Sequence, residues 1–391
     1  MRSGLWCACV VASVCTASTH AAAKQVATFV ASVPDVSIGV VEGDDAYVLA
    51  GLTNAIRLSD GRILVGSCAA NEVRVYDAEG RYLRTIGRQG GGPGEFQVVR
   101  RVFPANGDSI GVADAAFPTT AHRVAIFAPD GSYARMIQLP PRVEVIGRFA
   151  DGSFAGRLMG GFVDEPSVHR RLVTLYRLDA AGVPLDSVTG PWGLEMAEEQ
   201  GRGPRSVRFA RTASFAVLPD RLVSGPQDEA AFFEYRADLR TPRRVQTITR
   251  PEPMTNALRR QWDETRPVLI PRGGVIGSPG TSYASALPAY GWIVAGADGR
   301  VWVQDPYRPG VFALVWTAYR DGRAVARAEL PPRFYPTQFG EAWVLGIAYD
   351  DLGVERVQVY DLTAGPLSGR RLTPQDAQPP DRPRCGAWLS R

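Results

Sequence analysis

Residues 60–87 read DGRILVGSCAANEVRVYDAEGRYLRTIG, and this stretch contains the unit that decides the fold. Three short runs of β-prone residues are separated by glycine-containing turns, which is typical of antiparallel hairpins. The run just before it, Asn54–Leu58, supplies a fourth strand. The stretch therefore predicts a meander of four antiparallel strands in a unit of about forty residues.

The same pattern returns five more times, and it is most degenerate in the third and fourth of the six copies. The further copies lie at 106–139, 151–188, 220–248, 298–330 and 341–362. A single meander is marginally stable, so each copy has to bury its faces against its neighbours. We therefore expect an all-β fold, a six-bladed β-propeller of four-stranded antiparallel blades over residues 24–362, with its ring closed by the terminal segments.

Two segments resemble a known family of propellers. Residues 86–96, IGRQGGGPGEF, are similar to the connection between blades in NHL-type six-bladed β-propellers. Residues 345–357 resemble the last blade of a bacterial exported subgroup of undefined function. The resemblance covers most of residues 50–362 and implies the fold but no single activity, because the wider group includes binding proteins, metal-dependent lyases and lactonases.

The first 23 residues have the features of a secretory signal peptide. Arg2 precedes an apolar stretch at 5–17, and Ala21–Ala23 offer small residues for cleavage. The alternative is a lipoprotein with Cys15 as the lipidated residue, which Val14 disfavours because a small residue is preferred there. No other stretch reaches the ~18 apolar residues of a membrane span. We therefore expect an exported protein, periplasmic or extracellular.

An insertion at 191–206 and a tail at 363–391 fall outside the repeat. We expect the insertion to contain a helical turn, with Glu195, Glu198 and Glu199 forming a solvated face rather than a catalytic pair of carboxylates. The tail is polar and rich in proline, and we expect it to be loosely ordered.

A second insertion, at 251–283, contains the one convincing helix, TNALRRQWDET, with Thr255 as its N-cap. Trp262, Tyr290 and Trp292 are candidate ligand-binding residues. If this helix lay over the centre of the ring, aromatic and arginine side chains could line a pocket beneath it. The alternative is a helix that only packs on the scaffold through its own apolar residues.

No set of catalytic residues stands out, and none is assigned. His122 and His169 are the only histidines after the signal peptide, too few for the three-histidine sites of metal-dependent NHL-type lyases, so no zinc site is predicted. A calcium site stays open, because Asp114 and Asp305 stand at the ends of second strands, near one mouth of the central channel. The alternative for both aspartates is turn chemistry, in which the carboxylate accepts hydrogen bonds from local amides.

Cys68 and Cys385 are the only cysteines after the signal peptide, and they lie near the two ends of the predicted ring. Ring closure brings the ends of a propeller together, so the two cysteines are candidates for a disulfide in an oxidising compartment. The alternative is a pair of free thiols.

The charge pattern argues against nucleic acid as a partner. The formal net charge is +4, and the 44 basic residues, all arginine except Lys24, are interspersed with 40 acidic ones. The glycine-rich segment Gly90–Gly94 is followed by a β-prone stretch rather than a helix, so we expect a tight crossing between blades and not a phosphate-binding loop.

These features favour a monomeric binding protein of the cell envelope. Its ligand, an unknown protein or small molecule, would meet one face of the propeller near the insertion at 251–283. The alternative is an enzyme, an oxygen-ligated, calcium-dependent hydrolase or lyase that acts at the central channel.

Overall fold

The computed structural model describes most of the chain between residues 26 and 368. The described ranges are 26–115, 122–164, 169–190, 192–199, 203–236, 238–269, 282–306 and 315–368. The predicted signal peptide with Cys15, and the tail beyond residue 368, lie outside these ranges. Among the described residues, no helix is both long enough and apolar enough to cross a membrane.

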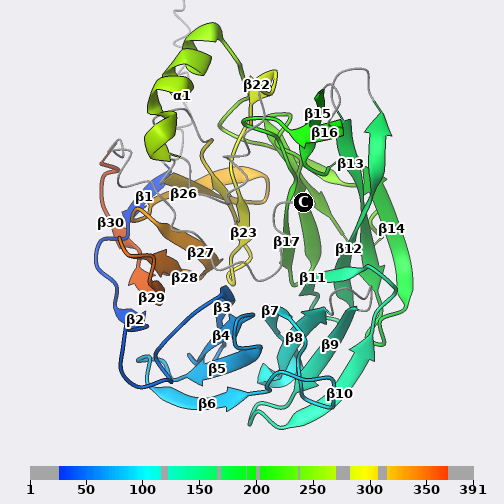
Figure 1. Ribbon diagram of the computed structural model, residues 1–391, viewed down its shortest axis with the longest axis vertical. Helices are drawn as coiled ribbons and strands as arrows, with labels where there is room; N and C mark the ends of the chain where they lie inside the picture. Colours follow the sequence, from blue (N-terminus) through cyan, green and yellow to red (C-terminus); the bar gives the residue numbers. More distant parts are fainter. Residues whose placement is uncertain are drawn as a thin grey trace, which may run out of the picture.

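Six antiparallel sheets stand around a common centre, so the chain is the six-bladed β-propeller that the repeat predicts (Figure 1). Five blades take their four strands in chain order, from the inner strand outward. Blade 1 comprises β3 (Leu52–Arg57), β4 (Ile63–Ser67), β5 (Glu72–Tyr76) and β6 (Tyr82–Ile86). Blade 2 comprises β7 (Val99–Pro104), β8 (Ile110–Ala115), β9 (His122–Phe127) and β10 (Tyr133–Gln138). Blade 3 comprises β11 (Glu144–Arg148), β12 (Phe154–Asp164), β13 (His169–Leu178) and β14 (Pro184–Gly190). Blade 4 comprises β17 (Ser214–Leu218), β18 (Arg221–Gly225), β19 (Ala231–Tyr235) and β20 (Arg243–Gln246). Blade 5 comprises β23 (Ile293–Ala295), β24 (Val301–Gln304), β25 (Val315–Arg320) and β26 (Arg323–Glu329).

The N-terminal segment closes the ring. Blade 6 takes β27 (Phe334–Phe339), β28 (Trp343–Tyr349) and β29 (Glu355–Asp361) from the end of the propeller, and its outer strand is β2 (Val36–Ile38). The preceding strand, β1 (Ala27–Val30), runs parallel to β26 in blade 5. It also pairs with β30 (Thr363–Ala364), the first part of the predicted tail. Closure by both terminal segments is thus confirmed.

The core is divided among the contacts between blades. Each pair of neighbouring blades encloses one cluster of buried apolar side chains, and the sixth of these clusters joins blade 6 to blade 1. Alternating apolar residues supply these clusters because side chains on a strand point to opposite faces of the sheet.

Two kinds of connection lie at opposite ends of the blades. Because neighbouring strands are antiparallel, first-to-second and third-to-fourth connections share one end, and second-to-third and blade-to-blade connections share the other. The first-to-second turns touch one another from blade to blade: Ser59 with Asp108, Asn106 with Arg148, Ala150 with Pro219, Arg221 with Gly299, and Arg300 with Gly340. We call this end the turn face and the opposite end the loop face.

The turn face consists of tight turns. Left-handed glycines with φ between 77° and 91° occupy Gly61, Gly80, Gly131, Gly152, Gly182, Gly299 and Gly322. Glycine suits these positions because it has no Cβ to clash in the left-handed region. The longer connections and both insertions belong to the loop face.

The insertion at 191–206 is a hairpin, so the predicted helical turn is wrong. Its strands are β15 (Glu195–Glu199) and β16 (Gly203–Ser206), and β15 pairs with β13 through His169 and Arg170. Strand β13 extends beyond β14, so its outer edge is left open at His169 and Arg170, and pairing with this edge satisfies the backbone of the insertion.

The insertion at 251–283 contains the predicted helix, α1 (Asn256–Leu269). Thr255 Oγ1 caps it by accepting a hydrogen bond of 3.2 Å from the amide of Leu258. The short strands β21 (Glu252–Pro253) and β22 (Ala286–Leu287) pair with each other beside it. Figure 1 shows α1 at the outer rim of the propeller rather than over the centre of the ring. The helix packs on the scaffold.

Candidate functional site

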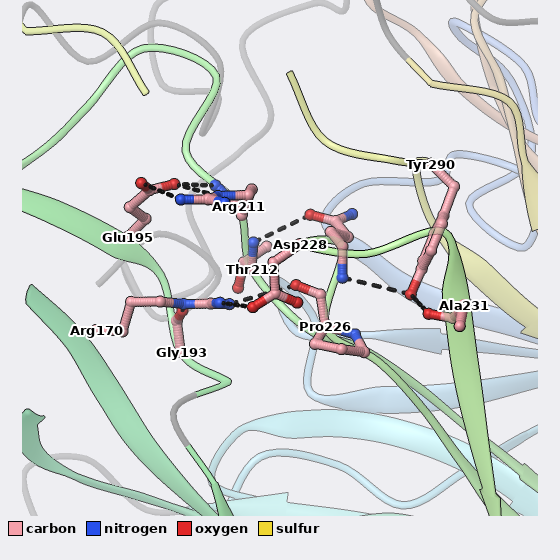
Figure 2. A network of polar contacts seen from close by, with 10 residues as sticks. Arg170, Gly193, Glu195, Arg211, Thr212, Pro226, Asp228, Ala231 and Tyr290 are labelled. Atoms are coloured by element: carbon pink, nitrogen blue, oxygen red, sulfur yellow. Dashed lines mark hydrogen bonds and ion pairs between the residues drawn. The ribbon is translucent and has the colours of Figure 1, made fainter. Parts of the chain in front are cut away.

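The junction of blades 3 and 4 carries a dense polar network on the loop face (Figure 2). Glu195, at the start of β15, is completely buried. Its carboxylate accepts hydrogen bonds from the amide, Nε and Nη2 of Arg211 at 3.1, 2.8 and 2.7 Å. These bonds to the carboxylate raise the pKa of the Arg211 guanidinium. Glu195 is therefore a paired internal charge, and the expected solvated face is wrong for this residue.

A second ion pair in the same network reaches solvent. Arg170 Nη1 lies 2.7 Å from Asp228 Oδ2, and the guanidinium also donates to the carbonyls of Gly193 and Pro226. Burial lowers the pKa of Arg170. Asp228, with 39% of its side chain exposed, is the member of this pair that faces water. The pair holds the entry to the hairpin against the second-to-third loop of blade 4.

Tyr290, a predicted ligand-binding residue, belongs to this network and is completely buried. Its hydroxyl donates to the carbonyl of Ala231 at 2.7 Å and accepts from the amide of Gln227 at 3.3 Å. The Gln227 side chain accepts from the amide of Thr212 and donates to the carbonyl of Gly291. Burial raises the pKa of Tyr290. The structure places this side chain between blades 4 and 5.

A second group of charges lies where blades 2 and 3 meet at the loop face. We call Arg100, Arg101, His122, Glu144 and Arg157 the arginine cluster. A register shift in the pairing of β7 with β8 separates Val99 from Arg101, so that two arginines follow one buried valine. Arg157 Nε donates a hydrogen bond of 2.9 Å to Glu144 Oε2, and Nη2 lies 2.8 Å from the same oxygen in an ion pair.

Positive charge is in excess in the arginine cluster. Burial lowers the pKa of Arg100 and of Arg101, and the negative charge of Glu144 opposes this effect. Burial alone would raise the pKa of Glu144, but the three arginines hold it below its usual value. Burial also lowers the pKa of His122. Arg157 binds the one carboxylate of the cluster, so among the described residues no carboxylate is bound to Arg101.

Asp114 stands next to the arginine cluster and is itself neutralised. It is 2% exposed, its Oδ1 accepts the amides of Gln97 and Val98 at 2.9 and 2.8 Å, and its Oδ2 lies 2.7 Å from Arg123 Nε. Arg123 also donates to the carbonyls of Gly91 and Glu95. These amides lie 17 and 16 positions before Asp114, in the connection between blades 1 and 2, so its contacts are not those of a local turn.

Asp305, the other candidate for ligand or calcium binding, is also engaged by an arginine. Its Oδ2 lies 2.7 Å from Arg327 Nη2. In the part of the chain that the structure describes, no three His, Cys, Asp or Glu residues form a group that could hold a metal ion. Calcium prefers oxygen ligands that are free to turn toward it. Since arginines occupy both carboxylates, the arrangement at Asp114 and Asp305 does not fit a calcium ion.

The two predicted tryptophans occupy different environments. Trp262, a residue of α1, is 1% exposed and packs edge-to-face on Phe209, with 4.9 Å between ring centroids. Trp292 precedes β23 on the loop face and is 51% exposed. The structure therefore does not gather Trp262, Tyr290 and Trp292 into one open site. Of the three, Trp292 alone presents its ring to solvent.

The remaining sequence predictions at this face concern a loop and a cysteine. Gly90–Gly94 fold around Glu95, whose Oε2 accepts the amide of Gly92 at 2.9 Å, so a carboxylate of the chain itself occupies the loop. Cys68 follows β4 and is disulfide-bonded. Cys385 lies outside the described residues, and the Cys68–Cys385 pairing stays a prediction.

Sequence reasoning missed the arginine cluster, although one signal was present. The inner strand of blade 2 reads VRRVFP, with two adjacent arginines where alternation predicts one. A doubled charge inside an apolar strand is a sign of a bulge that turns side chains out of the interface between blades.

Among the comparisons with known proteins, a family model supports the fold. A family model described as a 6-bladed beta-propeller, DUF5128, matches residues 43–117. Among curated proteins, none matches the sequence.

Solved structures with a similar course of the chain include a putative exported protein from Bacteroides fragilis (12% identity, 86% of this chain and 99% of the other, TM-score 0.47). A member of the duf4221 family from Bacteroides vulgatus is similar at 11% identity, covering 86% and 98%, with a TM-score of 0.48. Virginiamycin B lyase from Staphylococcus aureus is similar at 10% identity, covering 83% and 98%, with a TM-score of 0.42. Likenesses this distant carry no argument about activity. What is established is that the chain is a six-bladed β-propeller with four-stranded antiparallel blades.

Proposed function

We propose that the protein is an exported binding protein of the cell envelope, which captures its ligand on the loop face beside the insertion at 251–283. The observation that carries this proposal is the difference between the two faces. The turn face is built from tight glycine turns, whereas the loop face holds both insertions, the exposed Trp292 and the arginine cluster. Ligand-binding residues concentrate on loops that a rigid scaffold positions. The N-terminal 23 residues, with their apolar stretch and small residues for cleavage, support export.

The charged groups of the loop face support binding better than catalysis. Glu195, Arg170 and Asp114 are each held by an opposite charge and by further hydrogen bonds. Such pairs fix the positions of loops through charge-assisted hydrogen bonds. A carboxylate bound by a guanidinium is also a poor proton acceptor, which makes it a poor general base. The calcium-dependent hydrolase or lyase is the second hypothesis, and the arginine partners of Asp114 and Asp305 do not favour it. One tightly held calcium ion per chain in an elemental analysis would support that enzyme instead.

Trp292 offers the sharpest test of the proposed binding face. Tryptophan is enriched among the few interface residues whose truncation costs about 2 kcal/mol or more in affinity. We expect Trp292→Ala in the mature protein to weaken capture of the envelope component by about tenfold or more. Capture from an envelope extract, quantified by mass spectrometry against wild type, measures this loss.

The matched control is Leu185→Ala, since Leu185 is 59% exposed on the outer strand β14, away from the loop face. This variant should capture as wild type does. Deletion of residues 252–282 should abolish capture, provided that circular dichroism shows the propeller intact. Unchanged capture by both Trp292→Ala and the deletion would contradict the proposed face.

A further inference from the structure

The Arg101 side chain is exposed on an inner strand, and its guanidinium makes no ion pair or hydrogen bond with the described residues. Of the three arginines in the arginine cluster, Arg157 is bound to Glu144, and Glu144 is the one carboxylate within the cluster. The nearby Asp114 is bound to Arg123 and to two amides, so its negative charge is already balanced by Arg123. The guanidinium of Arg101 is therefore a cation without a fixed counter-ion.

Three elements bring the cluster together. The register shift in β7 turns Arg101 out of the apolar interface between the buried residues Val99 and Val102. The first residue of β11, Glu144, stands opposite Arg157 of β12, so both come from the loop-face end of blade 3. His122 begins β9 at the same end of blade 2. Rigid strands, and not long loops, thus fix the positions of these charges.

From this arrangement we infer that the arginine cluster binds an oxyanion group, a carboxylate or a phosphate, of the ligand that the loop face captures. The inference rests on the proposed function and adds the chemical class of the ligand. Guanidinium groups present planar donors that match carboxylate and phosphate oxygens. Both Nε and Nη2 of Arg157 lie against the same oxygen of Glu144, so the contacts with Glu144 leave its Nη1 for a ligand.

The electrostatics of the cluster agree with an anionic ligand. The Arg101 side chain reaches solvent, yet desolvation lowers its pKa, which is the behaviour of a cation in a partly enclosed place. An anion bound there would supply the missing negative charge in surroundings where water screens it less than at an open surface. Glu144 orients Arg157 and limits the excess charge, so a single oxyanion matches the cluster better than a polyanionic chain does.

The test uses the mature protein with two small probes, inorganic phosphate and succinate. Isothermal titration calorimetry at constant ionic strength, with sodium chloride as the balancing salt, separates site binding from general screening. We expect saturable binding of at least one probe. Binding of phosphate alone would show that the cluster selects a tetrahedral phosphate group. Binding of succinate alone would show that it selects a planar carboxylate.

Arg101→Gln removes the charge without breaking any ion pair, and it should weaken probe binding by at least about tenfold, the usual effect of losing one charge-assisted contact. The matched control is Arg135→Gln, because Arg135 is exposed on the outer strand of the same blade and makes no ion pair with a described residue. Arg135→Gln should bind like wild type. Thermal unfolding confirms that both variants are folded. No saturable binding to wild type, or equal binding to Arg101→Gln, would overturn the inference.

Capture from the envelope extract separates this inference from the proposed function. If Trp292→Ala loses capture and Arg101→Gln keeps it, the loop face binds but its ligand does not use the arginine cluster, and the inference fails alone. If both variants keep capture, the proposed face fails as well. Loss of capture in both supports the two together.

Discussion

Arginine–carboxylate contacts on the loop face differ from residue to residue. Glu195 is completely buried and receives three hydrogen bonds from Arg211, whereas Arg101 has solvent on one side and no carboxylate bound to it. The sequence offered a local turn as one alternative for Asp114, but it gave no sign that this carboxylate accepts amides 16 and 17 positions earlier in the chain. It could not reveal the pairing of Glu195 with Arg211, because the hairpin that carries Glu195 is positioned by a distant strand edge.

Removing Arg211 tests the buried pair. Arg211→Ala leaves the Glu195 carboxylate charged and desolvated, and loss of one partner of a buried ion pair commonly costs about 3–5 kcal/mol. The free energy of unfolding from urea denaturation should fall by that amount. Arg240→Ala is the control, because Arg240 is 76% exposed and its pair with Asp186 is at the surface, where such pairs contribute less than about 1 kcal/mol. Equal decreases in the free energy of unfolding for the two variants would show that the buried pair stabilises the fold no more than the surface pair does.

At the scale of elements, regular strands were predictable and inserted ones were not. The Asp-Gly turns and alternating apolar residues of blades 1, 2, 5 and 6 indicate strands locally, and Thr255 with Trp262 indicates α1. The hairpin at 195–206 looks helical in isolation, yet the free edge of β13 decides its structure. The structure of β2 is also decided by a distant partner, because this strand of three residues pairs with β29, which lies some 320 positions later. Long-range pairing of this kind leaves little trace in a short window of sequence.

The closing strand β2 gives a prediction at this scale. Ile38 is 1% exposed and packs between blades 6 and 1 with Ile63 and Val357. Ile38→Ala should lower the free energy of unfolding by about 2–5 kcal/mol, because it leaves a cavity at the point of ring closure. Val33→Ala, which truncates a side chain that is 74% exposed in the same segment, should stay within about 0.5 kcal/mol of wild type. Chemical denaturation of both variants measures these free energies. A change of less than about 0.5 kcal/mol for Ile38→Ala would mean that packing of β2 does not stabilise the closed ring.

At the scale of the whole molecule, the repeat predicts six blades, and the propeller has six. Counting repeats works because each blade is a local unit that meets only its neighbours. The division into a turn face and a loop face follows from the topology, but the place of α1 at the rim and the grouping of Arg101 with Glu144 and Arg157 depend on how blades stack. These are contacts between segments that are separate in sequence, and they decide where the candidate site lies.

The loop face as binding surface is tested most directly by hydrogen–deuterium exchange of the mature protein, with and without the envelope fraction that it captures. Bound ligand shields backbone amides from solvent and slows their exchange. Slower exchange is predicted in the loop-face connections at 87–98, 139–143 and 288–292, with no change in the turn-face connections at 58–62, 77–81 and 128–132. Protection confined to the turn face, or to the outer strands β6, β10 and β14, would contradict the account.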